Sequence, residues 1–383
     1  MQRVELRLDS GMGKHHLSLV GAKEILICNE PENALAKADA FISEHQGSYI
    51  GCAFGYDLKN DIEHLESSHE SFIPFPALIL FVPEAVSHEP IRESAPTRSI
   101  SSTRMVRQRP QAEYVGQVQK LLQSIQKGDI YEVNFCQELG FEAVNESADI
   151  LYERLLQRTD APYSGHLRYG DLHLLCGSPE LFLRRDGDII RSCPIKGTRK
   201  RDEDPAEDER IRRELESDPK ERAENIMITD LVRNDLSRVA MSQSVEVEEL
   251  CGIYSFRTVH QMISTVRADL KEGTSIIDLL RATFPMGSMT GAPKVSAMQH
   301  IEEHEDFRRG IYSGSIGYIH PNGDFRFNVV IRSILYDASN ARASISAGGA
   351  ITALSDPEAE YEESLLKARA MIEVIGYHPE PAS

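Results

Sequence analysis

The sequence lacks the features of membrane-spanning and secreted proteins. No apolar run approaches the length of a membrane span, and no apolar stretch follows the basic residue near the start of the printed chain. Cysteine is scarce: six cysteines are scattered along the chain without a Cys-x-x-Cys pair, which argues against a zinc site or a disulfide framework. These absences predict a protein that has no membrane contact and works in a reducing cytoplasm.

Basic residues are also in short supply. Lysine and arginine number 42 against 60 aspartates and glutamates, which gives a formal net charge of −18. A nucleic-acid partner is therefore not expected, because binding to phosphates requires a basic surface. A small anionic substrate is compatible with this charge, since local basic residues and backbone amides can create a favourable field inside a site.

The chain is long enough for one large domain or two ordinary ones, with 383 residues of which 41% are hydrophobic. No internal repeat is visible. Residues 87–109 are rich in Ser, Pro and charge, and they predict a linker or a long surface loop. We therefore expect an N-terminal subdomain with this linker over residues 1–110 and a larger, motif-rich domain over residues 111–383.

Strand-like runs outnumber helical ones. A helix is predicted over residues 114–125, with Gly128 ending it in the left-handed conformation. Tyr131, Val133 and Phe135 alternate as in a strand, and the short links between runs favour antiparallel pairing. We expect an α+β fold in which antiparallel sheets pack face to face and helices lie on the outside. Further strands are predicted at residues 24–28, 77–82, 172–175, 315–319, 325–335 and 343–346.

Two other predicted helices, over residues 218–234 and 356–375, each begin with Asp-Pro and carry a Glu-x-x-Glu pair. Residues three apart share one face of a helix, and two such pairs facing each other would suit Mg²⁺, which prefers oxygen ligands. Taken singly, each pair is better explained by the acidic first turn of a helix, which favours the helix dipole. The pairs are Glu221 with Glu224, and Glu360 with Glu363.

Two runs of small residues and one arginine each have two interpretations. Residues 285–294 are too rich in Gly and Pro for a helix, and they form either an anion-binding nest beside Lys294 or a plain surface turn. Residues 346–350 follow a strand, and they either offer amides to a carboxylate or simply make a turn. Arg332 is predicted within an apolar strand, where it either binds a substrate carboxylate or points out from a sheet edge.

Six stretches together resemble the chorismate-utilising enzymes. This family includes the large subunits of anthranilate synthase and aminodeoxychorismate synthase, and the isochorismate and salicylate synthases. The stretches occur in the family's order over roughly residues 110–376; the preceding part matches weakly, mainly at residues 51–57. The stretches are Gly177-Ser178-Pro179-Glu180, Pro194-Ile195-Lys196-Gly197-Thr198-Arg199, Asp230-Leu231-Val232-Arg233-Asn234-Asp235, Thr290-Gly291-Ala292-Pro293-Lys294, Gly310-Ile311-Tyr312-Ser313-Gly314, and residues 356–367.

The resemblance implies roles for particular residues. Glu180 matches the general acid that protonates the departing 4-hydroxyl of chorismate. Glu224 and Glu363 match the principal Mg²⁺ ligands, supported by Glu221 and Glu360, and the metal would clamp the ring carboxylate. The positions that match substrate-binding residues are Thr198, Tyr312, Arg332, Gly348, Gly349 and Lys367.

Lys196 separates the branches of the family. Anthranilate and salicylate synthases usually have alanine in this motif, whereas a lysine resembles aminodeoxychorismate synthase, where it acts as a nucleophile. Such a lysine must be partly neutral, so we expect burial or nearby cations to lower its pKa. By itself, the motif is better explained by an exposed loop lysine; the full family pattern favours the nucleophile.

The chain departs from the family pattern at three places. Glu132 stands where amine-using members usually have glutamine, and where isochorismate and salicylate synthases have a lysine that activates water; its role is open. Gln261 falls where many members have histidine, and Ala350 replaces a common glycine.

The resemblance implies that chorismate and ammonia give 4-amino-4-deoxychorismate, with Mg²⁺ as cofactor, on the way to 4-aminobenzoate and folate. No Gly-x-Cys-x-Gly turn is present, so we expect the ammonia to come from a separate glutamine amidotransferase. Anthranilate synthase component I is the first alternative, followed by an isochorismate or salicylate synthase. A catalytically inactive metabolite-binding regulator would be an alternative of another class, but it would have to lack the carboxylates that are present here.

Overall fold

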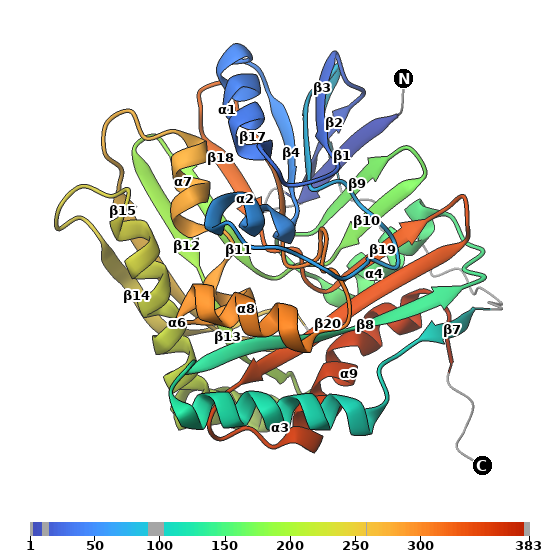
Figure 1. The fold of residues 1–383 in the computed structure, drawn as a ribbon, viewed down its shortest axis with the longest axis vertical. Coiled ribbons are helices and arrows are strands. Elements are labelled where there is room, and N and C mark those ends of the chain that lie inside the picture. The colour runs from blue at the N-terminus through green and yellow to red at the C-terminus, as the bar shows by residue number, and fades with distance from the viewer. Residues whose placement is uncertain (1–2, 10–14, 91–102, 258, 379–383) are drawn as a thin grey trace.

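The computed structural model describes residues 3–9, 15–90, 103–257 and 259–378, and it consists of two antiparallel sheets with helices around them (Figure 1). The first sheet has the strand order β16 (Gly291–Ala292), β8 (Glu132–Glu142), β20 (Arg342–Ile351), β19 (Ser333–Asp337), β10 (Leu172–Cys176), β9 (Gly165–Tyr169), β1 (Val4–Asp9), β2 (His15–Val20) and β6 (Ala85–Pro90), with β7 (Arg104–Arg107) also paired to β8.

The second sheet has the order β13 (Ile195–Lys200), β15 (Val259–Asp269), β12 (Ile189–Cys193), β11 (Leu181–Asp186), β18 (Phe325–Asn328), β17 (Ser315–Ile319), β4 (Ile50–Phe54), β5 (Leu78–Val82) and β3 (Glu24–Cys28), with β14 (Glu246–Ser255) paired to β15. The described helices are α1 (Ala34–Glu44), α2 (Lys59–Glu63), α3 (Gln111–Lys127), α4 (Ala148–Thr159), α5 (Pro205–Ser217), α6 (Pro219–Ser237), α7 (Ile276–Thr283), α8 (Lys294–His304) and α9 (Pro357–Val374), with 3₁₀ turns at η1 (Tyr56–Leu58) and η2 (Gly287–Met289).

The two sheets pack against each other through apolar side chains. Leu6 of β1 and Leu167 of β9 lie in one buried cluster with Ile79 of β5 and Ile316 of β17, so residues of both sheets share a core. Helices α4 and α9 cover the first sheet, and α6 and α7 pack on the second. The predicted α+β fold, with antiparallel sheets packed face to face and helices outside, is confirmed.

The helices that carry the glutamate pairs begin as the sequence predicts. The Asp218 carboxylate caps α6 by accepting a hydrogen bond of 2.9 Å from the Lys220 amide, and the Asp356 carboxylate caps α9 through the Ala359 amide. A proline occupies the first position of each helix, where it sacrifices no helical hydrogen bond. Gly128 ends α3 with φ +85°, also as predicted.

One strand prediction is wrong. Residues 325–335 form two strands, because the chain leaves the second sheet after Asn328 and enters the first at Ser333. Val329 and Val330 are fully buried in this crossing, so an apolar run that looks like one strand instead passes between two sheets. Arg332 therefore lies outside a strand, and its φ of +52° is in the left-handed region that a non-glycine residue rarely adopts.

The N-terminal strands are built into both sheets. β1, β2 and β6 extend the first sheet from β9, while β3, β4 and β5 extend the second from β17. The predicted linker at residues 87–109 contains the end of β6 and all of β7, so those parts are strand; residues 91–102 lie outside the described residues. The division of the chain near residue 110 stays a prediction.

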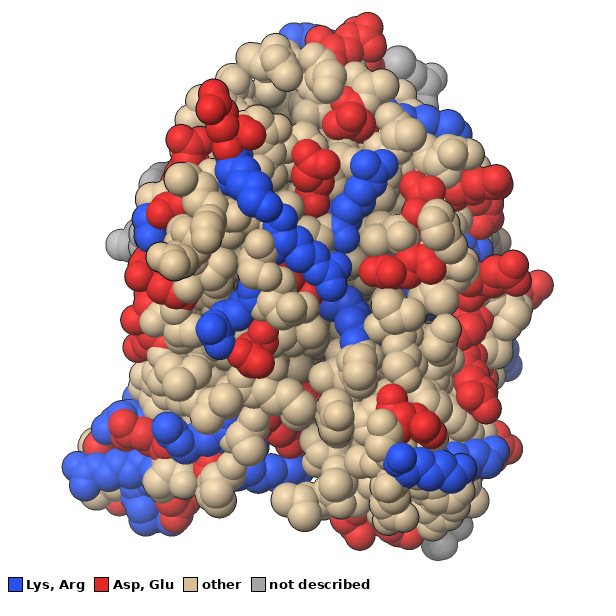
Figure 2. All heavy atoms as spheres, turned by 60° about the vertical axis from the view of Figure 1, so that its left-hand side comes forward, with Lys and Arg blue, Asp and Glu red and all other residues tan. Residues whose placement is uncertain are grey.

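Charged side chains of both signs share the surface. On the face in Figure 2, a band of Lys and Arg is bordered by Asp and Glu. On the second sheet, Arg191 Nη2 lies 2.9 Å from Glu248 Oε1, and Arg267 Nη2 lies 2.7 Å from Asp269 Oδ1. No helix in the described part of the chain is long and apolar enough to cross a membrane.

Candidate functional site

A cavity of about 540 Å³ is lined by parts of β13, β20, α6 and α9 together with Arg332. The predicted site residues come from both sheets and from both glutamate helices, and all except Gly349 line it. Those that do are Glu180, Lys196, Thr198, Glu221, Glu224, Tyr312, Arg332, Gly348, Glu360, Glu363 and Lys367. The structure thus brings these residues together around one cavity, and their roles stay predictions.

Glu180 precedes β11, and its side chain is buried. Burial raises the pKa of its carboxyl group to about 7, although a hydrogen bond from Ser288 and the positive charge of Lys196 oppose the shift. The Ser288 hydroxyl donates to Glu180 Oε1 over 2.7 Å. A carboxyl group with a pKa near neutrality is protonated often enough to act as a general acid.

Lys196 lies in an irregular part of β13. Ile195 pairs with Ile263 and Thr198 with Gln261 of β15, so Lys196 and Gly197 form a bulge in the ladder. Gly197 has φ +83°, a conformation that L side chains rarely adopt. The bulge thus sets the direction of the Lys196 side chain.

Lys196 is held by a carboxylate that the sequence left without a role. Its Nζ donates to Glu132 Oε1 of β8 over 2.8 Å, and the two side chains are 11% and 1% exposed. Burial by itself lowers the pKa of Lys196, but the negative charges of Glu132, Glu224 and Glu180 raise it above its ordinary value. The prediction of a lowered pKa is therefore wrong, because the groups facing Lys196 are anions.

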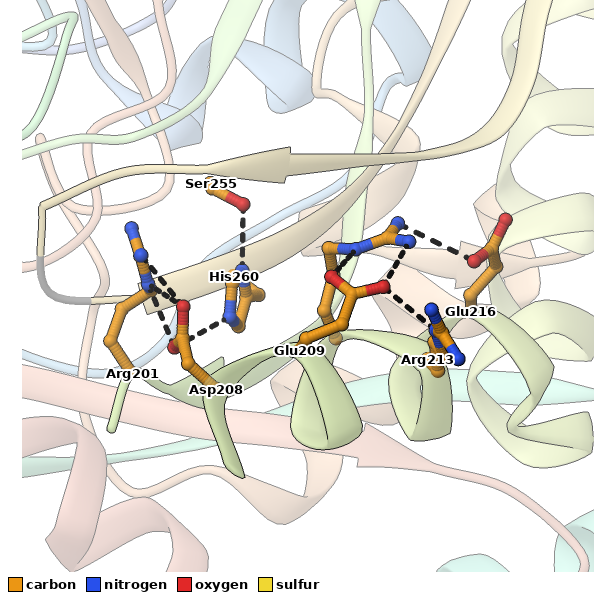
Figure 3. Close-up of polar contacts among 8 residues, drawn as sticks. Arg201, Asp208, Glu209, Arg213, Glu216, Ser255 and His260 are labelled. Atoms are coloured by element: carbon orange, nitrogen blue, oxygen red, sulfur yellow. Dashed lines mark hydrogen bonds and ion pairs between the residues drawn. The ribbon is translucent and has the colours of Figure 1, made fainter. Parts of the chain in front are cut away.

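The far end of β13 is fixed by the polar network in Figure 3. Arg201, just past the strand, donates through Nε to Asp208 of α5 at 2.9 Å, and Asp208 also contacts His260 Nε2 of β15 at 3.0 Å. The other ring nitrogen of His260 contacts Ser255 Oγ of β14 at 2.8 Å. These polar contacts hold β13, β14, β15 and α5 together next to the cavity.

The four glutamates differ in their partners. Arg199 Nη1 donates to Glu221 over 3.0 Å, Lys220 Nζ is 3.9 Å from Glu224, and Lys367 Nζ is 2.7 Å from Glu363. Burial raises the pKa of Glu224 to about 7 and also raises that of Glu360. Burial alone would raise the pKa of Glu363 too, but Lys367 outweighs it and lowers that pKa.

These carboxylates suit a hard divalent cation. Glu360 Oε2 is buried without a hydrogen-bond partner, and a cation is the usual partner for a buried anionic oxygen. Gly349 leaves space for one: a Cβ built there would lie 2.9 Å from Glu360 Oε2, 3.5 Å from Lys367 Nζ and 3.7 Å from Glu363 Oε1. The residues present therefore fit Mg²⁺, and a side chain at position 349 would fill part of this space.

Arg332 and Lys367 lie beside each other, next to Glu363. Arg332 Nη1 donates to the Lys367 carbonyl over 3.0 Å, and Lys367 Nζ donates to the Gly348 carbonyl over 2.9 Å. Tyr312 lines the same cavity, and its hydroxyl is 3.6 Å from Cys136 Sγ. Two cations and a phenol in a concave site can bind the carboxylates of a small anion.

Two site features were missed or wrongly read in the sequence. Ser288, the partner of Glu180, lies in the small-residue run 285–294, for which the sequence predicts no contact with Glu180. Lys294 does not flank an anion nest: its Nζ pairs with Asp235 and donates to the Thr283 carbonyl over 3.0 Å. A buried ion pair thus occupies the lysine of the anion-nest interpretation, one of the two left open for this run.

Comparisons with known proteins agree with this geometry. The model of the chorismate binding enzyme family matches residues 6–373. The chain is 44% identical over 280 residues to a protein of Oryza sativa subsp. japonica named probable aminodeoxychorismate synthase, chloroplastic, covering 72% of this chain and 31% of that protein. It is 38% identical over 266 residues to anthranilate synthase component 1 of Streptomyces coelicolor, covering 69% of this chain and 52% of that one.

A solved structure shares the fold. Anthranilate synthase component I from Streptococcus pneumoniae superposes with a TM-score of 0.79 at 24% identity, covering 94% of this chain and 92% of that one. The chain spans about half or less of the length of the two curated relatives. Because the family model matches nearly the whole chain, and the predicted site residues meet in one cavity, the chain belongs to the chorismate binding enzyme family.

Proposed function

We propose that this chain is the large subunit of an aminodeoxychorismate synthase, which replaces the 4-hydroxyl of chorismate with an amino group. The observation that carries the proposal is Lys196, a buried lysine in the same cavity as the general acid candidate Glu180. The 44% identity to the rice relative, which is named for this activity, supports the same choice.

The reaction has two substitutions. Neutral Lys196 Nζ bonds to C2 of chorismate, the ring double bonds shift, and the C4–oxygen bond breaks as Glu180 gives its proton to the departing hydroxyl, which leaves as water. Ammonia then bonds to C4, the double bonds shift back, and the C2–Nζ bond breaks with its electron pair on Nζ, which restores neutral Lys196. The ammonium formed at C4 then returns a proton to the Glu180 carboxylate. With a pKa near 7, about half of Glu180 is protonated at neutral pH and can supply the first proton.

Substrate carboxylates would be bound by the cations of the cavity. Arg332 and Lys367, which are linked through the Lys367 carbonyl, would hold a carboxylate of chorismate, and Tyr312, Thr198 and the Gly348 backbone would complete its position. The strained backbone at Arg332 supports this, because such strain persists mostly where a side chain must point in one direction.

Glu221, Glu224, Glu360 and Glu363 would hold Mg²⁺, which when bound would neutralise these carboxylates and orient the ring carboxylate of the substrate. The expectation is tested by removing single ligands: Glu224→Gln and Glu363→Gln should lose activity and Mg²⁺ binding, measured by calorimetry, without a change in circular dichroism. Full turnover in excess chelator would rule out a metal role.

Ammonia would come from a glutamine amidotransferase partner. The described cysteines are free and mostly buried, and burial raises the pKa of Cys136 and Cys176 to about 11, so these thiols are poor nucleophiles at neutral pH. Purified chain should use ammonium salts but not glutamine, and it should gain glutamine-dependent activity when a partner glutaminase is added. Glutamine use by the chain alone would contradict this.

Lys196 decides between the two candidate functions. Incubated with chorismate and no ammonia, the protein should form a covalent adduct on the peptide that contains Lys196, detected by mass spectrometry, and ammonia should chase it to product. Lys196→Ala should form no adduct and should shift any residual product towards the ortho-amino isomer, because C2 is then open to ammonia. Lys196→Arg should not restore para-amination, since a guanidinium stays charged.

The second candidate, anthranilate synthase component I, is favoured by the 38% identity to the Streptomyces coelicolor relative. It predicts ortho-amination and no adduct in the unmodified protein. Product identification by chromatography against both standards therefore separates the two functions, and normal 4-amino-4-deoxychorismate formation by Lys196→Ala would refute the covalent mechanism.

A further inference from the structure

Glu132 and Lys196 form a buried contact that joins the two sheets. Glu132 is the first residue of β8 in the first sheet, and Lys196 lies in the bulge of β13 in the second. The 2.8 Å distance between Nζ and Oε1 is that of a direct hydrogen bond. Glu132 is buried and Lys196 is exposed only on the cavity side, with side chains 1% and 11% exposed.

Several carboxyl groups face Lys196, but they are not equivalent. Glu132 of β8, Glu224 of α6 and Glu180 before β11 all act electrostatically on it, and Lys196 in turn acts on Glu363 of α9. Among the described residues, Glu132 is the one of these four that forms an ion pair with Lys196. Of these four carboxyl groups, Glu132 is therefore the one to which a proton on Nζ can pass directly.

The Glu132 carboxylate is held in place, and one of its two oxygens has no hydrogen-bond partner. The start of β8 is fixed by β16, where Glu132 pairs with Ala292 and the Tyr131 amide donates to the Ala292 carbonyl over 2.7 Å. Oε1 receives Lys196, while the buried Oε2 has no hydrogen-bond partner. A carboxylate in this state can take up a proton without losing another contact.

We propose that Glu132 is the base that takes the proton from Lys196 and thereby makes it a nucleophile. The inference rests on the proposed function, in which Nζ attacks C2. The proton passes from Nζ to the Glu132 carboxylate, and the freed lone pair forms the C2–N bond while Glu180 protonates the departing hydroxyl. When ammonia later expels the lysine, the proton on Glu132 returns to Nζ, and the ion pair is restored.

The pH dependence of adduct formation tests this without any variant. The rate of adduct formation is measured by rapid quench and intact-protein mass spectrometry, with saturating chorismate, excess Mg²⁺ and no ammonia. If Glu132 takes the proton, the rate is flat from about pH 5.5 to 7 and falls above pH 7 as Glu180 ionises. If Nζ must lose its proton to water, the rate instead rises about tenfold per pH unit below pH 7.

Two variants give a second, independent measurement. Glu132→Gln keeps the shape and can still accept a hydrogen bond from Nζ, but an amide cannot take up a proton. Its adduct rate, divided by that of the wild type, should rise about tenfold per pH unit between about pH 5.5 and 8, because proton loss to water becomes necessary. Glu132→Asp keeps an acid one methylene shorter, so its ratio should be lower than one and independent of pH. A merely structural role predicts flat ratios for both.

Each outcome has one meaning. A flat wild-type rate below pH 7 together with a rising Glu132→Gln ratio supports the proposal. A wild-type rate that rises with pH, or a flat Glu132→Gln ratio, overturns the role of Glu132 while leaving Lys196 as the nucleophile. Absence of any adduct in the wild-type protein overturns the covalent mechanism of the proposed function and this inference with it.

Discussion

Replacing Ser288 with alanine should raise the pKa of Glu180, the proposed general acid. Ser288 Oγ donates to Glu180 Oε1 over 2.7 Å, and this bond lowers the pKa of Glu180 against the larger effect of burial, which leaves it at about 7. A hydrogen bond to a charged acceptor is worth roughly 1 kcal/mol more than one to a neutral acceptor. Its loss should therefore raise the pKa of Glu180 by about one unit, to roughly 8.

The assay is kcat/KM for chorismate across pH, at constant free ammonia and saturating Mg²⁺, because this ratio reports groups of the free enzyme. With a pKa of about 7, roughly a tenth of Glu180 is protonated at pH 8; with a pKa near 8, about half is. Ser288→Ala should thus keep a fraction of its low-pH activity at pH 8 that is about five times the wild-type fraction.

Ser288→Thr, which retains the hydroxyl, is the matched control, and kcat/KM should fall at the same alkaline pH as in the wild type. If kcat/KM of Ser288→Ala falls at the same pH as in the wild type, or at a lower pH, the assignment of Glu180 as the buried acid is refuted.

Three other outcomes are expected. Glu180→Gln should abolish turnover but raise the free energy of unfolding at pH 8 by on the order of 3 kcal/mol, because the folded-state pKa is raised from 4.5 to about 7 and the wild type loses stability as pH rises through this window; chemical denaturation at pH 4 should show no such gain. Gly349→Ala should raise the Mg²⁺ concentration needed for half-maximal activity several-fold, because its methyl group would press on Glu360 Oε2 at 2.9 Å, and it should leave the melting temperature unchanged. An unchanged Mg²⁺ titration would contradict the proposed metal position. The enolpyruvyl group should stay on the product, because Gln261 cannot act as a general base, and a lactate dehydrogenase-coupled assay should detect no pyruvate from the purified chain.

The sequence predicted best what depends on local order along the chain. The capped helices α6 and α9 follow from Asp-Pro at their start, and Gly128 marks the end of α3. The family motifs name Glu180, Lys196 and the four glutamates, which line one cavity in the structure. Each of these features can be recognised from a few neighbouring residues, or from a short motif that is compared with the family by itself.

What the sequence could not give depends on which distant strands meet. Glu132 and Lys196 are 64 positions apart and belong to different sheets, so no spacing rule predicts their contact or the raised pKa of Lys196. The apolar run before Arg332 is read as one strand, because burial on all sides looks the same in a strand and in a crossing between sheets. Ser288 lies in η2 and Lys294 begins α8, yet both belong to one Gly- and Pro-rich run; Ser288 faces the cavity and Lys294 a buried aspartate.

The placement of the N-terminal strands has a consequence for synthesis on the ribosome. β4 pairs on one side with β17, whose partner residues are made about 260 positions later. At the usual speed of translation, β4 and its neighbours would wait for this partner for about 13 to 50 seconds with an apolar edge open. During that interval the nascent chain presents strands that other chains can pair with, so it should depend on chaperones more than its finished fold suggests.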